Sequence, residues 1–96
     1  MKHSCVYILA SKRNGTLDVG VTSDVLRRTW AHKSGAADGF TKKYCVHLLV
    51  PVEFHETMAD AILREKHIKK WRRAWKLELI EHDNPQWRDL YDEIQW

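Results

Sequence analysis

The stretch TLDVGVTSDVLRRTWAHK, residues 16–33, changes from the periodicity of a strand to that of a helix within a few residues. In TLDVGVT every second residue is aliphatic, as in a strand with one face against a core, and Asp18 lies on the other face. The helix that follows is expected to end near Ser34, before a glycine. In that helix Arg28 and His32 are four residues apart and share one face. An acid, a guanidinium and an imidazole are therefore expected around one corner between a strand and a helix.

The residues before this stretch predict a β-hairpin. CVYILAS, residues 5–11, is almost continuously apolar, as in a strand that is covered on both faces. Asn14–Gly15 is typical of a two-residue hairpin turn, because both positions favour a positive φ. Such a turn pairs Tyr7 with Thr22 and places Tyr7 and Asp18 on the same face, four rungs and about 13 Å apart. A longer loop would bring these two side chains closer together.

The second half of the chain predicts one more strand and mainly helices. YCVHLLVPVEF, residues 44–54, is expected to be a strand, and Pro51 indicates an edge or a bulge. A helical stretch is expected from Thr57, with a capping box, to about residue 81, with a break around residues 71–74. Asn84–Pro85 is expected to cap a short last helix. The pattern predicts an α+β fold, a small antiparallel sheet with helices packed on it, in one domain over residues 1–96.

Composition and charge limit the possible partners. No apolar run is long enough to cross a bilayer and no secretory signal is recognisable, so we expect a cytoplasmic protein without a membrane partner. Cys5 and Cys45 follow no metal-ligand spacing and are expected to be reduced and buried. The net charge is only +3, but KHIKKWRRAWK, residues 66–76, holds six Lys or Arg and two Trp. This stretch indicates a polyanionic partner, or else a solvated helix face whose two tryptophans belong to the core.

One acid lies in an unexpected place on the long helical stretch. Glu65 projects from the centre of the helix face that should be buried, which is formed by Met58, Ala61, Ile62, Ile68, Trp71 and Trp75. A buried carboxylate without a partner is costly, so Glu65 should be paired or should bind a cation. Two interpretations remain open here: an ion pair with Lys69 or Arg28, or a ligand for a hard divalent cation such as Mg²⁺.

The other polar candidates also have simpler interpretations. Tyr7 is compatible with a core aromatic, Arg28 with a surface charge, His32 with an exposed histidine and Asn84 with a helix cap. Together with Glu65, however, they combine a phenol, a guanidinium, an imidazole and an acid on a strand and two helices.

Four segments resemble the short stand-alone bacterial proteins of the GIY-YIG superfamily: VYIL, VGVTSDVLRRTWAHK, LREKHIKKWRRAWK and NPQWRDLY. The resemblance covers nearly the whole chain in the same order and spacing. It implies the GIY-YIG endonuclease fold, a three-stranded antiparallel sheet flanked by helices, and the cleavage of DNA. The site residues that it implies are Tyr7, in CVY instead of GIY, Arg28, His32, the metal ligand Glu65 and, by a looser match, Asn84.

Asp18 departs from the family pattern, because it stands in DVG where the family has the tyrosine of YIG. An aspartate is shorter than a tyrosine, and when ionised it cannot donate a hydrogen bond. It is compatible with a general base, with a second carboxylate for a metal, or with a disabled site.

The resemblance implies a metal-dependent DNA endonuclease. Glu65 would bind Mg²⁺ or Mn²⁺, Arg28 would contact the phosphate, and Tyr7 with Asp18 or His32 would orient the attacking water. DNA that is branched, nicked or damaged would dock on basic residues, namely Lys42, Lys43, Lys69, Lys70, Arg72, Arg73 and Lys76. The alternatives are a catalytically inactive nucleic-acid-binding module of the same fold and a small interaction protein.

Overall fold

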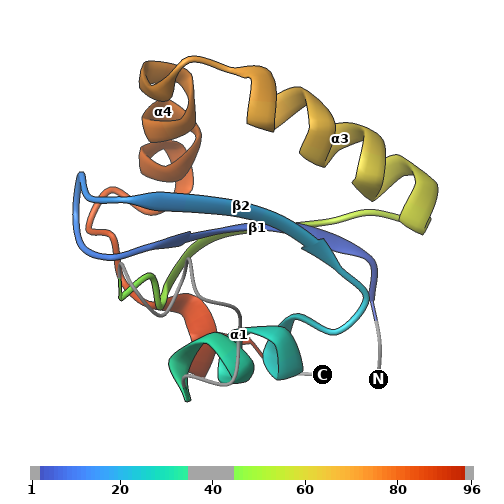
Figure 1. Ribbon diagram of the computed structural model, residues 1–96, viewed down its shortest axis with the longest axis horizontal. Helices are drawn as coiled ribbons and strands as arrows, with labels where there is room; N and C mark the ends of the chain where they lie inside the picture. The colour runs from blue at the N-terminus through green and yellow to red at the C-terminus, as the bar shows by residue number, and fades with distance from the viewer. Residues whose placement is uncertain (1–2, 35–44, 95–96) are drawn as a thin grey trace.

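The computed structural model describes residues 3–34 and 45–94, which form a mixed fold of strands and helices (Figure 1). Its elements in chain order are β1 (Cys5–Ala10), β2 (Leu17–Thr22), α1 (Val25–Lys33), β3 (Leu48–Phe54), α3 (Met58–Lys70), α4 (Arg73–Asp83) and a 3-10 turn, η1 (Leu90–Glu93). The three strands are antiparallel and lie in the order β2-β1-β3. The predicted α+β class is therefore confirmed. None of the helices among these residues is both long and apolar enough to cross a bilayer.

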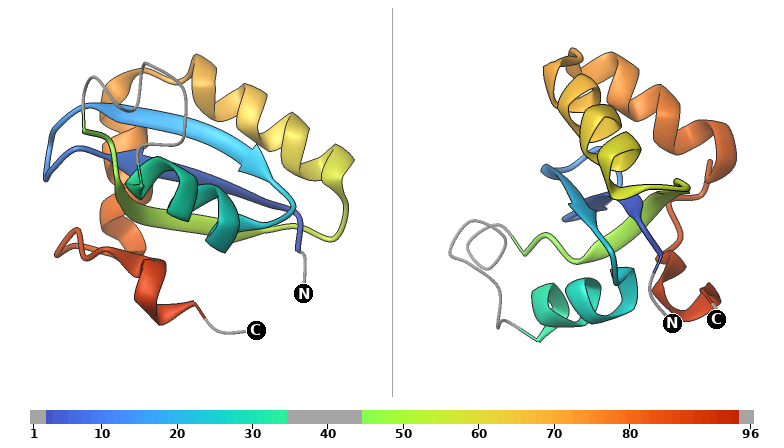
Figure 2. Two further views of the ribbon diagram at one scale, coloured as in Figure 1. Left: turned by 60° about the horizontal axis from the view of Figure 1, so that its bottom comes forward. Right: turned by 90° about the vertical axis from the view of Figure 1, so that its right-hand side faces the viewer.

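The central strand β1 is buried on both faces, as its sequence predicts. Val6 and Ile8 point to one side, where apolar side chains of α3 and α4 cover the sheet. Cys5, Tyr7 and Leu9 point to the other side, where α1 and η1 pack. Figures 1 and 2 show the resulting layers, with α3 and α4 on one face of the sheet and α1 on the opposite face. Two separate clusters of apolar side chains thus share one sheet, and β2 forms one of its edges.

The hairpin between β1 and β2 has a longer loop than predicted. Tyr7 pairs with Gly20 instead of Thr22, and the loop closes through hydrogen bonds from Ser11 N to Thr16 O (3.0 Å) and from Gly15 N to Lys12 O (2.9 Å). The Ser11 hydroxyl also accepts a hydrogen bond from Thr16 N, which favours this wider turn. Because the pairing shifts by two residues, every side chain keeps its face.

Most predicted helix boundaries are confirmed. Thr57 caps α3 by accepting a hydrogen bond from Asp60 N (3.1 Å), and the helical stretch breaks between Lys70 and Arg73, inside the predicted interval. The N-cap residue of α1 is Asp24, whose side chain accepts a hydrogen bond from Arg27 N at 3.2 Å.

The predicted role of Asn84 as the cap of a last helix is wrong. Asn84 ends α4, and its buried side chain instead organises the segment that follows. Its Nδ2 donates to Val50 O (3.0 Å) and Arg88 O (2.8 Å), and its Oδ1 accepts from Arg88 N (3.0 Å). Trp87 has a φ of 57°, so the chain turns around this amide instead of continuing as a helix.

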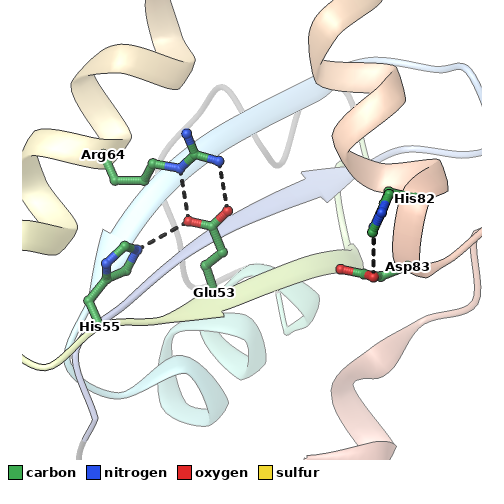
Figure 3. Close-up of polar contacts among 5 residues, drawn as sticks. All are labelled: Glu53, His55, Arg64, His82 and Asp83. Carbon is green, nitrogen blue, oxygen red and sulfur yellow. Dashed lines mark hydrogen bonds and ion pairs between the residues drawn. The ribbon is translucent and has the colours of Figure 1, made fainter.

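A carboxylate on β3 fixes the orientation of α3 (Figure 3). Glu53 accepts two hydrogen bonds from Arg64, each 3.0 Å long, and a third contact comes from His55 Nε2 at 3.1 Å. Partial burial acts to raise the pKa of Glu53, but the hydrogen bonds from Arg64 and His55 outweigh it and lower that pKa. The Arg64 guanidinium also stacks over Trp71, 4.9 Å from the ring centroid.

Three expectations about burial are wrong. Cys5 is buried as expected, but Cys45 is exposed. Ile62 and Trp75, assigned to the buried helix face, have 38% and 45% of their surface exposed. A straight continuation of the α3 stripe would bury Trp75, but the break after Lys70 starts a new helix with a different axis.

Candidate functional site

A polar hollow of about 280 Å³ lies at the free edge of β2. It is lined by Tyr7, Asp18, Val19, Gly20, Val21, Arg28, Glu65 and Lys69. These residues come from β1, β2, α1 and α3. The helices α1 and α3 lie on opposite sides of the sheet (Figures 1 and 2), so their side chains meet only by reaching around the edge strand. The hollow therefore brings together residues that are distant in the sequence and belong to different layers.

Gly20 allows Tyr7 to reach this edge. A Cβ atom on Gly20 would lie 2.4 Å from the phenolic oxygen of Tyr7 and 2.5 Å from its Cζ, closer than real atoms approach. The aromatic ring therefore crosses β2 at the one position without a side chain. At the edge, Arg28 Nε donates a hydrogen bond of 3.2 Å to the Tyr7 hydroxyl. The strand supplies the phenol, and α1 supplies the guanidinium that orients it.

The Tyr7 phenol remains protonated at neutral pH. Burial raises its pKa, the hydrogen bond from Arg28 opposes that shift, and the charge of Asp18 adds to the increase. Since Arg28 donates to the phenolic oxygen, the phenolic proton is directed to another acceptor. Before ligand binding, Tyr7 is thus a hydrogen-bond donor and not a base.

Glu65 has the partner that one of the two sequence interpretations required. Its Oε2 lies 3.0 Å from Lys69 Nζ, and its side chain is only 13% exposed. The same carboxylate faces the hollow that Tyr7 and Arg28 also line. An ionised carboxylate has about four acceptor positions, so an ion pair with Lys69 leaves room for a cation.

The oxygen atoms that line the hollow are of the kind that coordinate a hard divalent cation. Glu65 and Asp18 supply carboxylates, and Tyr7 supplies a phenolic oxygen. Among residues 3–34 and 45–94, no group of three or more His, Cys, Asp or Glu side chains is arranged to hold a metal. One or two carboxylates completed by water and phosphate is the pattern that Mg²⁺ uses.

His32 lies behind the hollow and not in it. It is 6% exposed, and its ring is 6.4 Å from that of Tyr7, at an interplanar angle of 58°. The simpler interpretation as an exposed histidine is therefore wrong, and its place in the fold is to back the Tyr7 ring. Asn84 is bonded to β3 at Val50 and is not among the residues of the hollow.

The predicted basic surface divides into residues with different contacts. Lys69 lines the hollow, and Lys70 is exposed. Arg73 donates to the carbonyls of Asn14 and Gly15, at 2.8 and 2.5 Å, and so fixes the hairpin loop to α4.

Two further basic residues complete this surface, Arg72 at the N-cap of α4 and Lys76 within α4. The Arg72 guanidinium lies over the exposed Trp75 ring at 4.9 Å, and Lys76 is half-buried. The other two predicted contacts, Lys42 and Lys43, lie outside the described residues.

The steric role of Gly20 was missed by the sequence analysis. The two-residue turn placed Thr22 opposite Tyr7, so no contact with Gly20 followed from it. The sequence did show that Gly20 shares a strand face with Asp18. Only the correct loop length, however, places Gly20 directly opposite Tyr7.

Comparisons with known proteins agree with this geometry. Residues 3–78 match the family model of the GIY-YIG catalytic domain. The chain belongs to the GIY-YIG family. UPF0213 protein CPE1444 of Clostridium perfringens is 39% identical over 75 residues, which are 78% of this chain and 80% of the relative. UPF0213 protein SSP2268 of Staphylococcus saprophyticus is 35% identical over 75 residues, which are 78% and 90% of the two chains.

A solved structure also resembles this GIY-YIG protein over most of its length. The solution NMR structure of UPF0213 protein BH0048 from Bacillus halodurans superposes with a TM-score of 0.56, at 28% identity and with 93% of each chain covered. The predicted fold family is therefore confirmed, and it is a nuclease-like fold.

Proposed function

We propose that this GIY-YIG protein hydrolyses phosphodiester bonds in DNA and uses Mg²⁺ or Mn²⁺ bound at Glu65. One observation carries the proposal: Tyr7, Arg28 and Glu65, from three separate elements, line a single hollow. A phenol, a guanidinium and a carboxylate around one space suit a phosphate group and an attacking water.

Each residue of the hollow has a proposed role that follows from its charge and its hydrogen-bonding groups. Arg28 carries five N–H donors in a planar fork, and its bond to Tyr7 fixes the plane in which the fork faces a phosphate. Tyr7, protonated, donates to the attacking water and orients it. A divalent cation at Glu65 would neutralise charge on the phosphate and on the leaving oxygen.

Asp18 takes the place of a second phenol in this proposal. It lines the hollow near Tyr7, and its charge contributes to the raised pKa of that phenol. An ionised carboxylate accepts protons, so Asp18 is proposed to take the proton from the water that Tyr7 orients. His32, behind Tyr7, is proposed to hold the phenol in position.

The basic residues Lys69 and Lys70 would bind the DNA backbone without reading its sequence. Such contacts leave the choice of target to DNA structure, and branched, nicked or damaged DNA are the substrates to compare.

A nicking assay tests the proposal. Supercoiled plasmid and branched DNA are incubated with the protein and Mg²⁺ or Mn²⁺, beside Glu65→Gln and Glu56→Gln. Glu56 is an exposed carboxylate outside the hollow, so its variant is the matched control. Glu65→Gln should lower the nicking rate by about 10²–10³, the typical effect of losing one group that stabilises charge in the transition state. Equal rates for the two variants would contradict the role of Glu65.

The second candidate function is a nucleic-acid-binding module without catalysis, and the aspartate at position 18 favours it. Asp18→Tyr, assayed beside the parent protein, separates the two. Cleavage by the variant alone would show that the parent protein lacks catalysis, as the binding module requires. Equal cleavage by both proteins would show that the aspartate supports the reaction. A protein that neither cleaves DNA nor binds it in a salt-dependent way would fit the third class, a small interaction protein.

A further inference from the structure

A second polar hollow, of about 270 Å³, adjoins the candidate site. It lies between the end of β2 and the first turns of α1, and its lining consists of Thr22, Ser23, Asp24, Arg27, Arg28 and Ala31. Arg28 lines both hollows. Two hollows that share one lining residue are placed to hold neighbouring groups of the same ligand.

The lining of this second hollow favours an anion. Its lining residues include two arginines, Arg27 and Arg28, and two hydroxyl-bearing residues, Thr22 and Ser23, against one acid, Asp24. That carboxylate already accepts a hydrogen bond from Arg27 N at 3.2 Å, as the cap of α1. The Thr22 hydroxyl oxygen accepts from Asp24 N at 3.0 Å, so its own proton can be donated to a ligand.

The same lining disfavours a nucleobase. None of its six residues is aromatic, so the hollow offers no ring on which a base would stack. The Arg27 side chain is exposed, and within residues 3–34 and 45–94 it forms no ion pair that would have to break. A phosphate group satisfies both the charge and the hydroxyl donors.

We propose that this second hollow binds the phosphate next to the scissile one on the same nucleic-acid strand. The inference rests on the proposed function, which assigns the scissile phosphate to the hollow of Arg28 and Glu65. Arg27 would then set which phosphodiester bond lies at the reacting position. It is a positioning residue, because it contacts a phosphate that does not react.

The first test measures binding of a fluorescently labelled single-stranded oligonucleotide by anisotropy, in EDTA, at several salt concentrations. The variants are Arg27→Ala, Arg27→Lys and Lys12→Ala. Lys12 lies in the hairpin loop at the other end of β2, so its variant removes the same charge away from the hollow. Arg27→Ala should reduce the slope of log K against log salt by about 0.7, the value for one phosphate contact on a single strand. Lys12→Ala should leave the slope unchanged, and Arg27→Lys should largely restore it.

The second test replaces each phosphate of the oligonucleotide in turn by an uncharged methylphosphonate. The parent protein should be sensitive at two adjacent positions, one for each hollow. In Arg27→Ala one of these positions should lose its effect, while the other keeps it. A parent sensitive at one position only, or a variant that keeps both sensitivities, would overturn the inference and leave the proposed function intact. A parent protein without salt-dependent binding would overturn the inference, and the additional absence of nicking in the plasmid assay would overturn the proposed function.

Discussion

The contact between Gly20 and Tyr7 makes a sharp prediction about stability. In Gly20→Ala the added methyl group would lie 2.4 Å from the Tyr7 hydroxyl oxygen, so the buried ring must shift. Overpacking of this kind typically costs about 1–3 kcal/mol. The backbone effect has the opposite sign, since alanine in a strand is favoured over glycine by about 0.5–1 kcal/mol. We therefore expect Gly20→Ala to lower the free energy of unfolding by about 0–2.5 kcal/mol, the overpacking cost less the backbone gain.

The same substitution in a Tyr7→Leu background isolates the clash. A leucine side chain ends before the positions of the Tyr7 Cζ and hydroxyl oxygen, so the methyl group meets nothing there. In this background Gly20→Ala should be neutral or stabilising by about 0.5–1 kcal/mol. Urea denaturation followed by circular dichroism measures all four proteins of the cycle. An equal effect of Gly20→Ala in both backgrounds would refute the packing of the phenol against this glycine.

Three further predictions concern other parts of the molecule. Asn84→Ala should lower the free energy of unfolding, measured by urea denaturation, by about 1–3 kcal/mol, because buried backbone groups lose their partner. A change below about 0.5 kcal/mol, the size typical of a surface substitution, would contradict this. The lowered pKa of Glu53 stabilises the fold above its ordinary value of 4.5, and this contribution is lost as pH falls through the lowered pKa. Arg64→Met should therefore flatten the dependence of stability on pH below about 5, and an unchanged acid limb would exclude the link. With a thiol reagent at pH 8, Cys45 should react quickly and Cys5 only after unfolding, because burial, with a smaller effect of a nearby carboxylate, raises the Cys5 pKa to about 11; two fast thiols would contradict the packing of β1.

Local signals in the sequence were sufficient where the structure depends on neighbouring residues. The capping pair of Thr57 and Asp60 gives the start of α3 correctly, because both groups of the hydrogen bond lie within one turn. Pro51 lies in β3, an edge strand whose pairing with β1 is irregular, as its missing N–H predicts.

The details of one loop and the tertiary contacts decided what the sequence pattern could not. The Asn14–Gly15 pair is compatible with more than one loop length, and the hydrogen bonds of Ser11 select the wider loop. The parity of the strands does not depend on that choice, so the shared face of Tyr7 and Asp18 was predicted correctly. The hydrogen bonds of Asn84 to β3 depend on how distant segments pack, and no local pattern encodes them.

The candidate site joins two apolar clusters that lie on opposite faces of the sheet. Tyr7 belongs to the cluster under α1, whereas Glu65 extends from α3, which covers the other cluster. A phosphate held by Arg28 and by a divalent cation at Glu65 would link α1 to α3 across the edge of the sheet, and would so couple the two clusters mechanically. Amide protons in α1 and α3 would then become slower to exchange together, although the two helices lie on opposite faces of the sheet.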